Sequence, residues 1–242
     1  MQLGMPEPVH LSGWEGLAHL VDQHFKDGWI YRGVPGFHSK EGLRPRIGRE
    51  RSRISPTGEP LPHDVNEERR LLQQFQREAR ALFEWEPKTD LEWMILGQHH
   101  LLPTRLLDWS ESLLVAAYFA VNEAVPLQGT HAVIYGVKPP KTIENLAVDP
   151  FSPTMNPEPQ LVRPPHINQR ITAQQGVFTL HTDPTQDWVS DGIRRWYIPT
   201  TECFTVKKKL NFCGIHAASL FPDSADQHTR HLSWLHKVGR LS

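Results

Sequence analysis

Cysteine is scarce in this chain, and its scarcity excludes two classes of protein. The 242 residues include two cysteines, Cys203 and Cys213. Two are too few for the disulfide framework of a small secreted domain and are consistent with a reducing cytosol. No CxxC or HExxH spacing occurs, which argues against a zinc site. We therefore expect a cytoplasmic protein without a metal.

Net charge and long apolar runs are also lacking. The formal net charge is −1, so no overall charge attracts nucleic acid or an anionic membrane surface. No apolar run approaches the roughly 20 residues of a membrane-spanning helix, and the first residues, MQLGMPEPVH, lack the pattern of a secretory signal. With 38% hydrophobic and 22% charged residues, the composition predicts a globular protein that has neither a membrane nor a nucleic-acid partner.

The apolar periodicity predicts a mixed α+β fold. Helical spacing appears over residues 12–26, 65–83, 90–99 and 113–121, with further helices expected over 168–175, 201–213 and 232–238. Apolar runs and β-propensity predict strands over 29–34, 131–137, 177–182 and 196–199. Residues 138–165, which contain many prolines, are expected to be irregular. We predict one domain over residues 1–242, with N-terminal helices and a small split mixed β core.

The segment 97–120, GQHHLLPTRLLDWSESLLVAAYFA, places polar side chains next to a helix that should be buried. Such groups need partners, because an unpaired buried charge is costly. Arg105 and Asp108 either pair with each other and brace the loop, or face a ligand. Ser110 or Thr104 is expected to cap the following helix.

A second polar feature lies at the end of the predicted strand 29–34. Arg32 follows an apolar run, and Gly33 and Gly36 come next. Glycine allows the backbone to turn and a ligand to approach closely. We predict that this strand presents Arg32 to a binding site.

Together these segments resemble the FRG domain family. Its Phe-Arg-Gly signature corresponds here to Tyr31-Arg32-Gly33, and its Gln-His-x-Gly-x-Pro-Thr-Arg-Leu-Leu-Asp-Trp block to residues 98–110. Further matches are the segments 174–178, 214–215 and 220–223, so the resemblance covers about residues 12–235. Leu101 stands where the family commonly has glycine, and we expect a local change of the loop there.

A more remote similarity is to ADP-ribosyltransferases of the arginine-serine-glutamate type. In that resemblance Arg32 grips the phosphates of NAD, and Ser110 precedes the small-residue helix that contains residues 115–120. The third element of those enzymes ends in a catalytic acid, and Gly176 occupies that position here. The resemblance implies an ADP-ribosyltransferase-like core with NAD as a substrate and no resident cofactor.

Cleavage of an N-glycosidic bond develops positive charge on the ribose, which a carboxylate can stabilise. Asp108 is the best-placed candidate. His99 is the candidate general acid or base, with His100 behind it, although a histidine at a helix C-terminus also favours the helix dipole. Gln175 would hydrogen-bond the leaving group or a base edge. The remaining candidates would bind the ligand: Arg32, Gly33, Gln98, Arg105, Trp109, Ser110 and Arg170.

Two basic stretches have less specific interpretations. The arginines between residues 44 and 53 fit either a solvated loop or a flap that faces phosphate, since arginine suits phosphate geometry. The run 207–209, three consecutive lysines, is expected to be a solvated helix surface.

Two function classes follow. The first is an enzyme that acts on NAD or another nucleotide by ADP-ribosyl transfer or glycohydrolysis, as a bacterial toxin or anti-phage effector. The second is a binding module for a nucleotide or protein that uses the same pocket without turnover, and Gly176 favours it. A protein target or an antitoxin is a possible partner in the first class.

Overall fold

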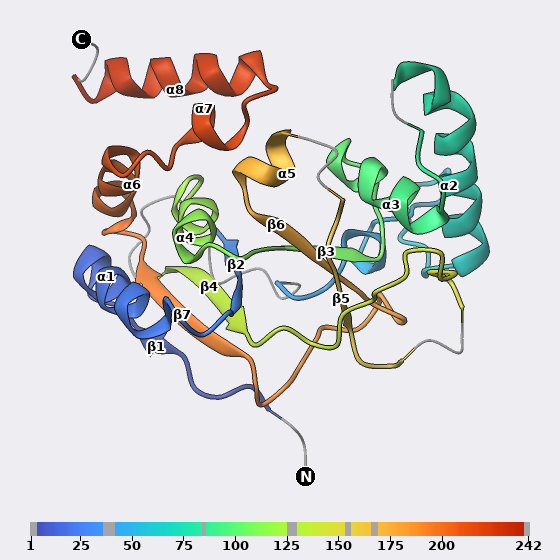
Figure 1. The fold of residues 1–242 in the computed structure, drawn as a ribbon, viewed down its shortest axis with the longest axis horizontal. Helices are drawn as coiled ribbons and strands as arrows, with labels where there is room; N and C mark the ends of the chain where they lie inside the picture. Colours follow the sequence, from blue (N-terminus) through green and yellow to red (C-terminus); the bar gives the residue numbers. More distant parts are fainter. Residues whose placement is uncertain are drawn as a thin grey trace.

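The protein is described by a computed structural model over residues 4–35, 42–83, 86–124, 130–152, 156–165 and 169–239. In these residues a seven-stranded sheet has the order β1-β7-β4-β2-β3-β6-β5 (Figure 1). Its strands are β1 (Val9–His10), β2 (Ile30–Val34), β3 (Leu106–Ser110), β4 (His131–Val137), β5 (Gln160–Val162), β6 (Gly176–Leu180) and β7 (Arg194–Pro199). The β1–β7 pair is parallel and the other pairs are antiparallel, so the predicted α+β class with a mixed β core is confirmed.

Two strands near the centre of the sheet, β2 and β3, have the fewest residue pairs between them. β2 pairs with β4 along its whole length, and β3 does the same with β6. Between β2 and β3 the only register pair in the described strands is Tyr31 with Ser110. This seam divides the sheet into two halves, and residues on both of its sides lie close together without a continuous ladder between them.

Helices surround the sheet. They are α1 (Gly13–His24), α2 (Val65–Ala79), α3 (Asp90–His99), α4 (Leu113–Val121), α5 (Gln169–Ala173), α6 (Cys203–Phe212), α7 (Ala217–Leu220) and α8 (Ala225–Lys237). Figure 1 shows α2 and α3 at one end of the sheet and α1 and α6 at the other, with α7 and α8 at the edge of the molecule beside α6. None of the helices in these described segments is long and apolar enough to cross a membrane.

α4 is the helix buried most deeply against the sheet. It is apolar on all sides, as expected of a helix in a core. A Cβ placed on Gly33 of β2 would lie 1.9 Å from the carbonyl oxygen of Ala116. Gly33 therefore allows the close packing of β2 on α4, and it also lies in the wall of the cavity described below. Gly36, the other glycine predicted to let a ligand approach, lies outside the described residues.

Several boundaries differ from the sequence predictions. Ser112 caps α4 through its hydroxyl and the Val115 N–H, so neither Ser110 nor Thr104 is the cap. β5 lies within the stretch predicted to be irregular, and α8 begins seven residues before the predicted start, at Ala225 rather than residue 232. β1 and α7 were not predicted, because two and four residues are too short to show a periodicity.

Candidate functional site

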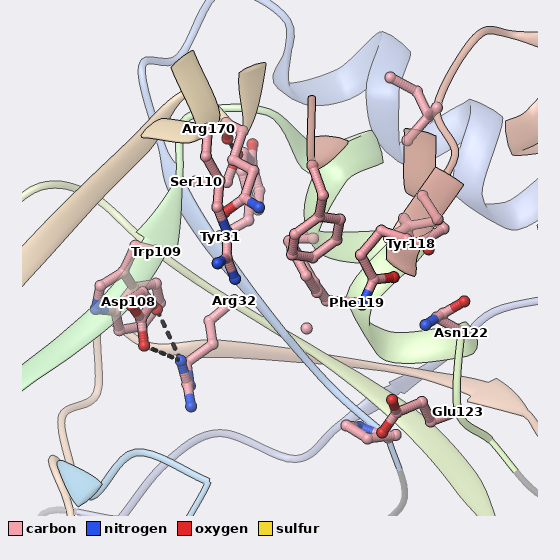
Figure 2. A pocket seen from close by; sticks show the side chains of 18 of the residues that line it. Tyr31, Arg32, Asp108, Trp109, Ser110, Tyr118, Phe119, Asn122, Glu123 and Arg170 are labelled. Atoms are coloured by element: carbon pink, nitrogen blue, oxygen red, sulfur yellow. Dashed lines mark hydrogen bonds and ion pairs between the residues drawn. The ribbon is translucent and has the colours of Figure 1, made fainter. Parts of the chain in front are cut away.

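A cavity of about 640 Å³ lies at the seam between β2 and β3 (Figure 2). Its wall includes Tyr31, Arg32 and Gly33 from β2 and the residues 106–110 of β3. Pockets for small molecules and cofactors have volumes of roughly 300–1,000 Å³. The cavity is therefore large enough for a nucleotide-sized ligand.

Arg32 and Asp108 meet across the seam. The Nη1 of Arg32 donates to the backbone carbonyl of Asp108 at 2.9 Å and lies 3.7 Å from its Oδ2 (Figure 2). The Nε of Arg32 donates to the carbonyl of Gly42 at 3.0 Å. Burial lowers the pKa of Arg32, Asp108 raises it and Arg49 lowers it, yet a guanidinium stays charged at neutral pH. The structure thus brings Arg32 and Asp108, both candidates from the sequence, next to each other.

Asp108 presents its carboxylate to the cavity with its direction fixed. Its side chain is 58% exposed, although residues on both sides of it in β3 are buried. Gln98 Nε2 donates to Oδ2 at 3.0 Å, and the Gln98 Oε1 accepts the Thr104 hydroxyl at 2.7 Å. Gln98 is itself anchored and therefore holds the carboxylate of Asp108 in place.

Basic side chains dominate the charged part of the wall. The cavity is lined by Arg32, Arg46, Arg49, Arg170, Lys207 and Arg230, against the carboxylates of Asp108 and Glu123. The Arg170 guanidinium lies 4.5 Å from the centre of the Phe221 ring, and burial lowers its pKa while Asp223 and Asp108 raise it. Since Arg46 and Arg49 also line the cavity, part of the arginine-rich stretch faces the site.

Ser110 is held by backbone groups. Its hydroxyl donates to the carbonyl of Gln174 at 2.7 Å and accepts the Ser112 N–H at 3.0 Å. This contact brings Gln174 to the cavity wall, and Gln174 also donates to the carbonyl of Leu220 at 3.0 Å. Gln175 is exposed, has a φ of 46° and is not among the residues lining the cavity. The amide at the wall is therefore that of Gln174.

These positions fall on a segment that a family model also recognises. Residues 27–128 match the model of the FRG domain. Over this segment the chain is similar to the FRG domain family. The matched segment contains Arg32, Gln98, Asp108 and Ser110 and ends before Gln174. Searches of curated proteins and of solved structures found no match.

Within the matched segment, Arg105 does not pair with Asp108. Its guanidinium forms a bidentate pair with Glu68 of α2, at 2.9 Å from Nε and 2.7 Å from Nη2. Its Nη1 also donates to the carbonyls of Pro150 and Thr182. Arg105 is buried outside the cavity, and the brace that it forms joins β3 to α2.

Trp109 also faces the core. It is 4% exposed, its indole N–H donates to the Thr179 hydroxyl at 2.9 Å, and its ring packs edge-on against Trp188. Alternate residues of a strand point to opposite faces, so an exposed Asp108 places the Trp109 ring away from it. Trp109 is among the residues that line the cavity, although these contacts hold its ring in the core.

His99 and His100 are not among the residues that line the cavity. Burial, together with Arg170 and His100 and opposed by Asp223, lowers the pKa of His99 to about 4. His99 is therefore neutral at pH 7. In that state it cannot donate the proton of a general acid, and it acts as a positioning contact to Asp223, 3.4 Å away.

One part of the cavity wall was not identified from the sequence. Residues near the C-terminus form it: Lys207, Asn211, His216, Arg230, His231 and Trp234. We call this group the C-terminal wall. Lys207 is half-buried rather than solvated, and its Nζ lies 5.4 Å from the Trp234 ring. A helical spacing of Gln227, His231 and Trp234 was the available signal, because it places all three on one face of α8.

The described part of the chain contains no group of three or more His, Cys, Asp or Glu side chains that could hold a metal ion. The cavity wall presents arginine, lysine, histidine, carboxylate, amide, hydroxyl and aromatic side chains.

Proposed function

We propose that this protein binds NAD or a related nucleotide in the cavity and cleaves the bond between ribose and nicotinamide. The observation that carries the proposal is the meeting of Arg32 and Asp108 at the seam, one suited to phosphate and the other to a developing positive charge. The remote resemblance to ADP-ribosyltransferases supports the same choice of substrate.

The reaction needs a carboxylate more than it needs a proton donor. When the ribose–nicotinamide bond breaks, its electron pair leaves with nicotinamide, which departs neutral, and the ribose carbon becomes positive. The Asp108 carboxylate, oriented by Gln98, would stabilise this charge electrostatically. A water molecule or an acceptor group then adds to the carbon and loses its proton.

The arginines around Asp108 would hold the diphosphate. Arg170 is anchored against Phe221, and Arg46 donates through Nη1 to the carbonyl of Leu101 at 2.9 Å. Guanidinium groups recognise phosphate through pairs of N–H donors. Arg32, already held by two carbonyls, would lose little conformational freedom on binding.

A second candidate is a binding module that uses the same cavity without turnover. Gly176, at the position of the acid in the resembling enzymes, is the observation that favours it. Gly176 pairs in register with Ser110 and provides no carboxylate. In the enzyme hypothesis Asp108 must replace that acid.

A toxin or anti-phage effector is the biological role that we propose for the enzyme. Depletion of NAD, or modification of a target, would then arrest the cell, and an antitoxin protein would restrain the activity. Growth arrest on expression of the wild-type protein and its absence with Asp108→Asn would support this role.

The biochemical test follows nicotinamide release from NAD by the purified protein and by Arg32→Ala and Asp108→Asn. Asp22→Asn is the matched control, because Asp22 is an exposed carboxylate on α1. We expect Asp108→Asn to lower kcat by about 10²–10³-fold with a nearly unchanged Kd, and Arg32→Ala to weaken binding.

The outcomes separate the candidates. Binding of NAD without nicotinamide release by the wild type would favour the binding module. No binding of NAD or of other nucleotides would overturn both candidates.

A further inference from the structure

The C-terminal wall forms a part of the cavity that Arg32 and Asp108 do not explain. It is built from the end of α6, from His216 at the start of α7 and from one face of α8, which lie together in Figure 1. α8 has no buried residue. Its inward face therefore contributes more to the cavity wall than to the hydrophobic core.

Three rings of this wall are nearly parallel. The His216 and His231 rings stack with centroids 4.1 Å apart at an interplanar angle of 8°, and His231 lies 6.4 Å from Trp234 at 20°. Burial is the main cause that lowers the pKa of both histidines, and the neighbouring histidines and Lys207 act in the same direction. His216 also accepts the Ser219 N–H at Nδ1, at 3.1 Å, which requires a lone pair there. The rings are therefore neutral and planar at pH 7, and such rings suit a planar heterocycle.

Asn211 contributes a hydrogen-bond acceptor that has no donor in the described part of the chain. Its Oδ1 is buried and has no hydrogen-bond partner among the described residues, and Asn211 lines the cavity. A buried acceptor without a donor is unfavourable. A rotation of the Asn211 side chain that turns this oxygen toward the cavity, together with a ligand that brings an N–H group to it, would remove that cost.

Lys207 and Arg230 complete the wall with positive charge. The Lys207 Nζ donates to the carbonyl of Asn122 at 3.4 Å and lies over the Trp234 ring. Burial lowers the pKa of Lys207, and Glu123 opposes this shift. The wall thus combines planar rings, an acceptor for an N–H group and cations near one another.

We propose that the C-terminal wall is a subsite for an adenine nucleotide moiety, in which the Asn211 oxygen accepts the exocyclic amine of the base. The base lies against the His231 and Trp234 rings, and Lys207 and Arg230 face the attached phosphate. This proposal rests on the proposed function and deepens it, because it places the adenosine half of a dinucleotide at the C-terminal wall and the reacting half at Arg32 and Asp108.

The test compares ADP with IDP by calorimetry, using the full chain. IDP has an oxygen in place of the amine, so it repels the Asn211 oxygen. We expect the wild type to bind ADP about tenfold more tightly than IDP, the effect of about one hydrogen bond. In Asn211→Leu this preference should fall to within about twofold. The variant should keep its thermal stability, because an unpaired buried acceptor has been replaced by an apolar group.

Nicotinamide mononucleotide keeps the two proposals distinguishable. It probes the end of the cavity with Arg32 and Asp108, so Asn211→Leu should leave its binding unchanged while Arg32→Ala weakens it. Equal wild-type affinities for ADP and IDP, or a preference for ADP that survives Asn211→Leu, would overturn the adenine subsite alone. Failure of the mononucleotide, ADP and NAD to bind would overturn the proposed function and the subsite with it.

Discussion

Arg105 and Glu68 form a buried, bidentate ion pair between β3 and α2. Both side chains are 3% exposed, and the closer contact, from Nη2 to Oε2, is 2.7 Å. His63 adds a contact to the same carboxylate oxygen at 2.8 Å. Burial raises the pKa of Glu68, but His63 and Arg105 outweigh it, and the net pKa is lowered. The pair fixes the strand that presents Asp108 to the cavity.

Glu68→Gln should destabilise the fold strongly. It leaves the Arg105 charge buried without its carboxylate, and breaking such a pair costs about 3–5 kcal/mol. Urea unfolding of the variant measures this loss. The double variant Glu68→Leu with Arg105→Met removes both charges and should recover much of the stability. A single variant within about 0.5 kcal/mol of the wild type would show that the pair contributes little.

The sequence could not identify the partner of Arg105. Asp108 lies three residues from Arg105 in the chain. Glu68 lies in a helix with several other acidic residues, and nothing in the sequence distinguishes it from those at the surface. The pairing depends on how α2 docks on the sheet, which no local periodicity encodes. By contrast, Arg32 and Asp108 were assigned to one site through the resemblance to the FRG domain family, although the strand that carries Asp108 was not predicted.

Gly33→Ala should disrupt the packing of β2 on α4. The added Cβ would lie 1.9 Å from the carbonyl of Ala116 and 2.5 Å from the Ala120 nitrogen, and both are backbone atoms that cannot rotate away. Overpacking of this kind costs about 3 kcal/mol or more. Thermal unfolding measures the loss. Gly176→Ala is the matched control in the same sheet, because its Cβ would meet nothing closer than 3.5 Å; equal losses in the two variants would contradict this account.

Leu101→Gly should stabilise the protein. Leu101 has a φ of 70° and follows the last turn of α3, where its N–H bonds to the carbonyl of Gln98 and that of Leu102 bonds to Gly97. This is a Schellman motif, which favours glycine at the left-handed position. Removing the Cβ relieves about 1–2 kcal/mol of left-handed backbone strain. The greater flexibility of glycine in the unfolded chain lowers the free energy of unfolding by about 0.5–1 kcal/mol. We expect a net gain of about 0.5–1 kcal/mol in urea unfolding.

Leu101→Ala is the control for that gain. It removes the same exposed side chain but keeps the Cβ, and therefore the strain. A gain from alanine equal to that from glycine would assign the effect to the side chain and not to the backbone.

The fold was predictable where an element is long and its pattern is local. α2, α3 and α4, together with β2 and β4, fall within a few residues of their predicted bounds. The C-terminal wall was not predictable, since Trp234 and Asn211 reach the cavity only through the docking of α6, α7 and α8. Which face of an amphipathic helix meets a ligand is a property of the tertiary structure.

His181 should make the protein acid-sensitive. It is 3% exposed, and burial lowers its pKa to about 3, with Arg32 and Arg105 lowering it further. The Thr179 hydroxyl accepts the indole N–H of Trp109 and lies 3.0 Å from His181 Nε2. Neutral His181 can accept the hydroxyl proton at this nitrogen. Because the folded pKa is below the unfolded value of 6.5, the stabilisation is complete above pH 6.5 and is lost as the pH falls toward 3.

The loss should be on the order of 3 kcal/mol between pH 7 and pH 4, measured as the free energy of unfolding in urea at each pH. Glutamine does not titrate, so His181→Gln should remove this loss of about 3 kcal/mol between pH 7 and pH 4. The variant should also be less stable than the wild type at pH 7, because the substitution disturbs the packing around residue 181. His19→Gln, at an exposed position on α1, should leave the wild-type slope intact. If the two variants show the same slope, the acid sensitivity originates elsewhere, and the carboxylates of Glu68 and Asp149, whose pKa values are also lowered, become its source.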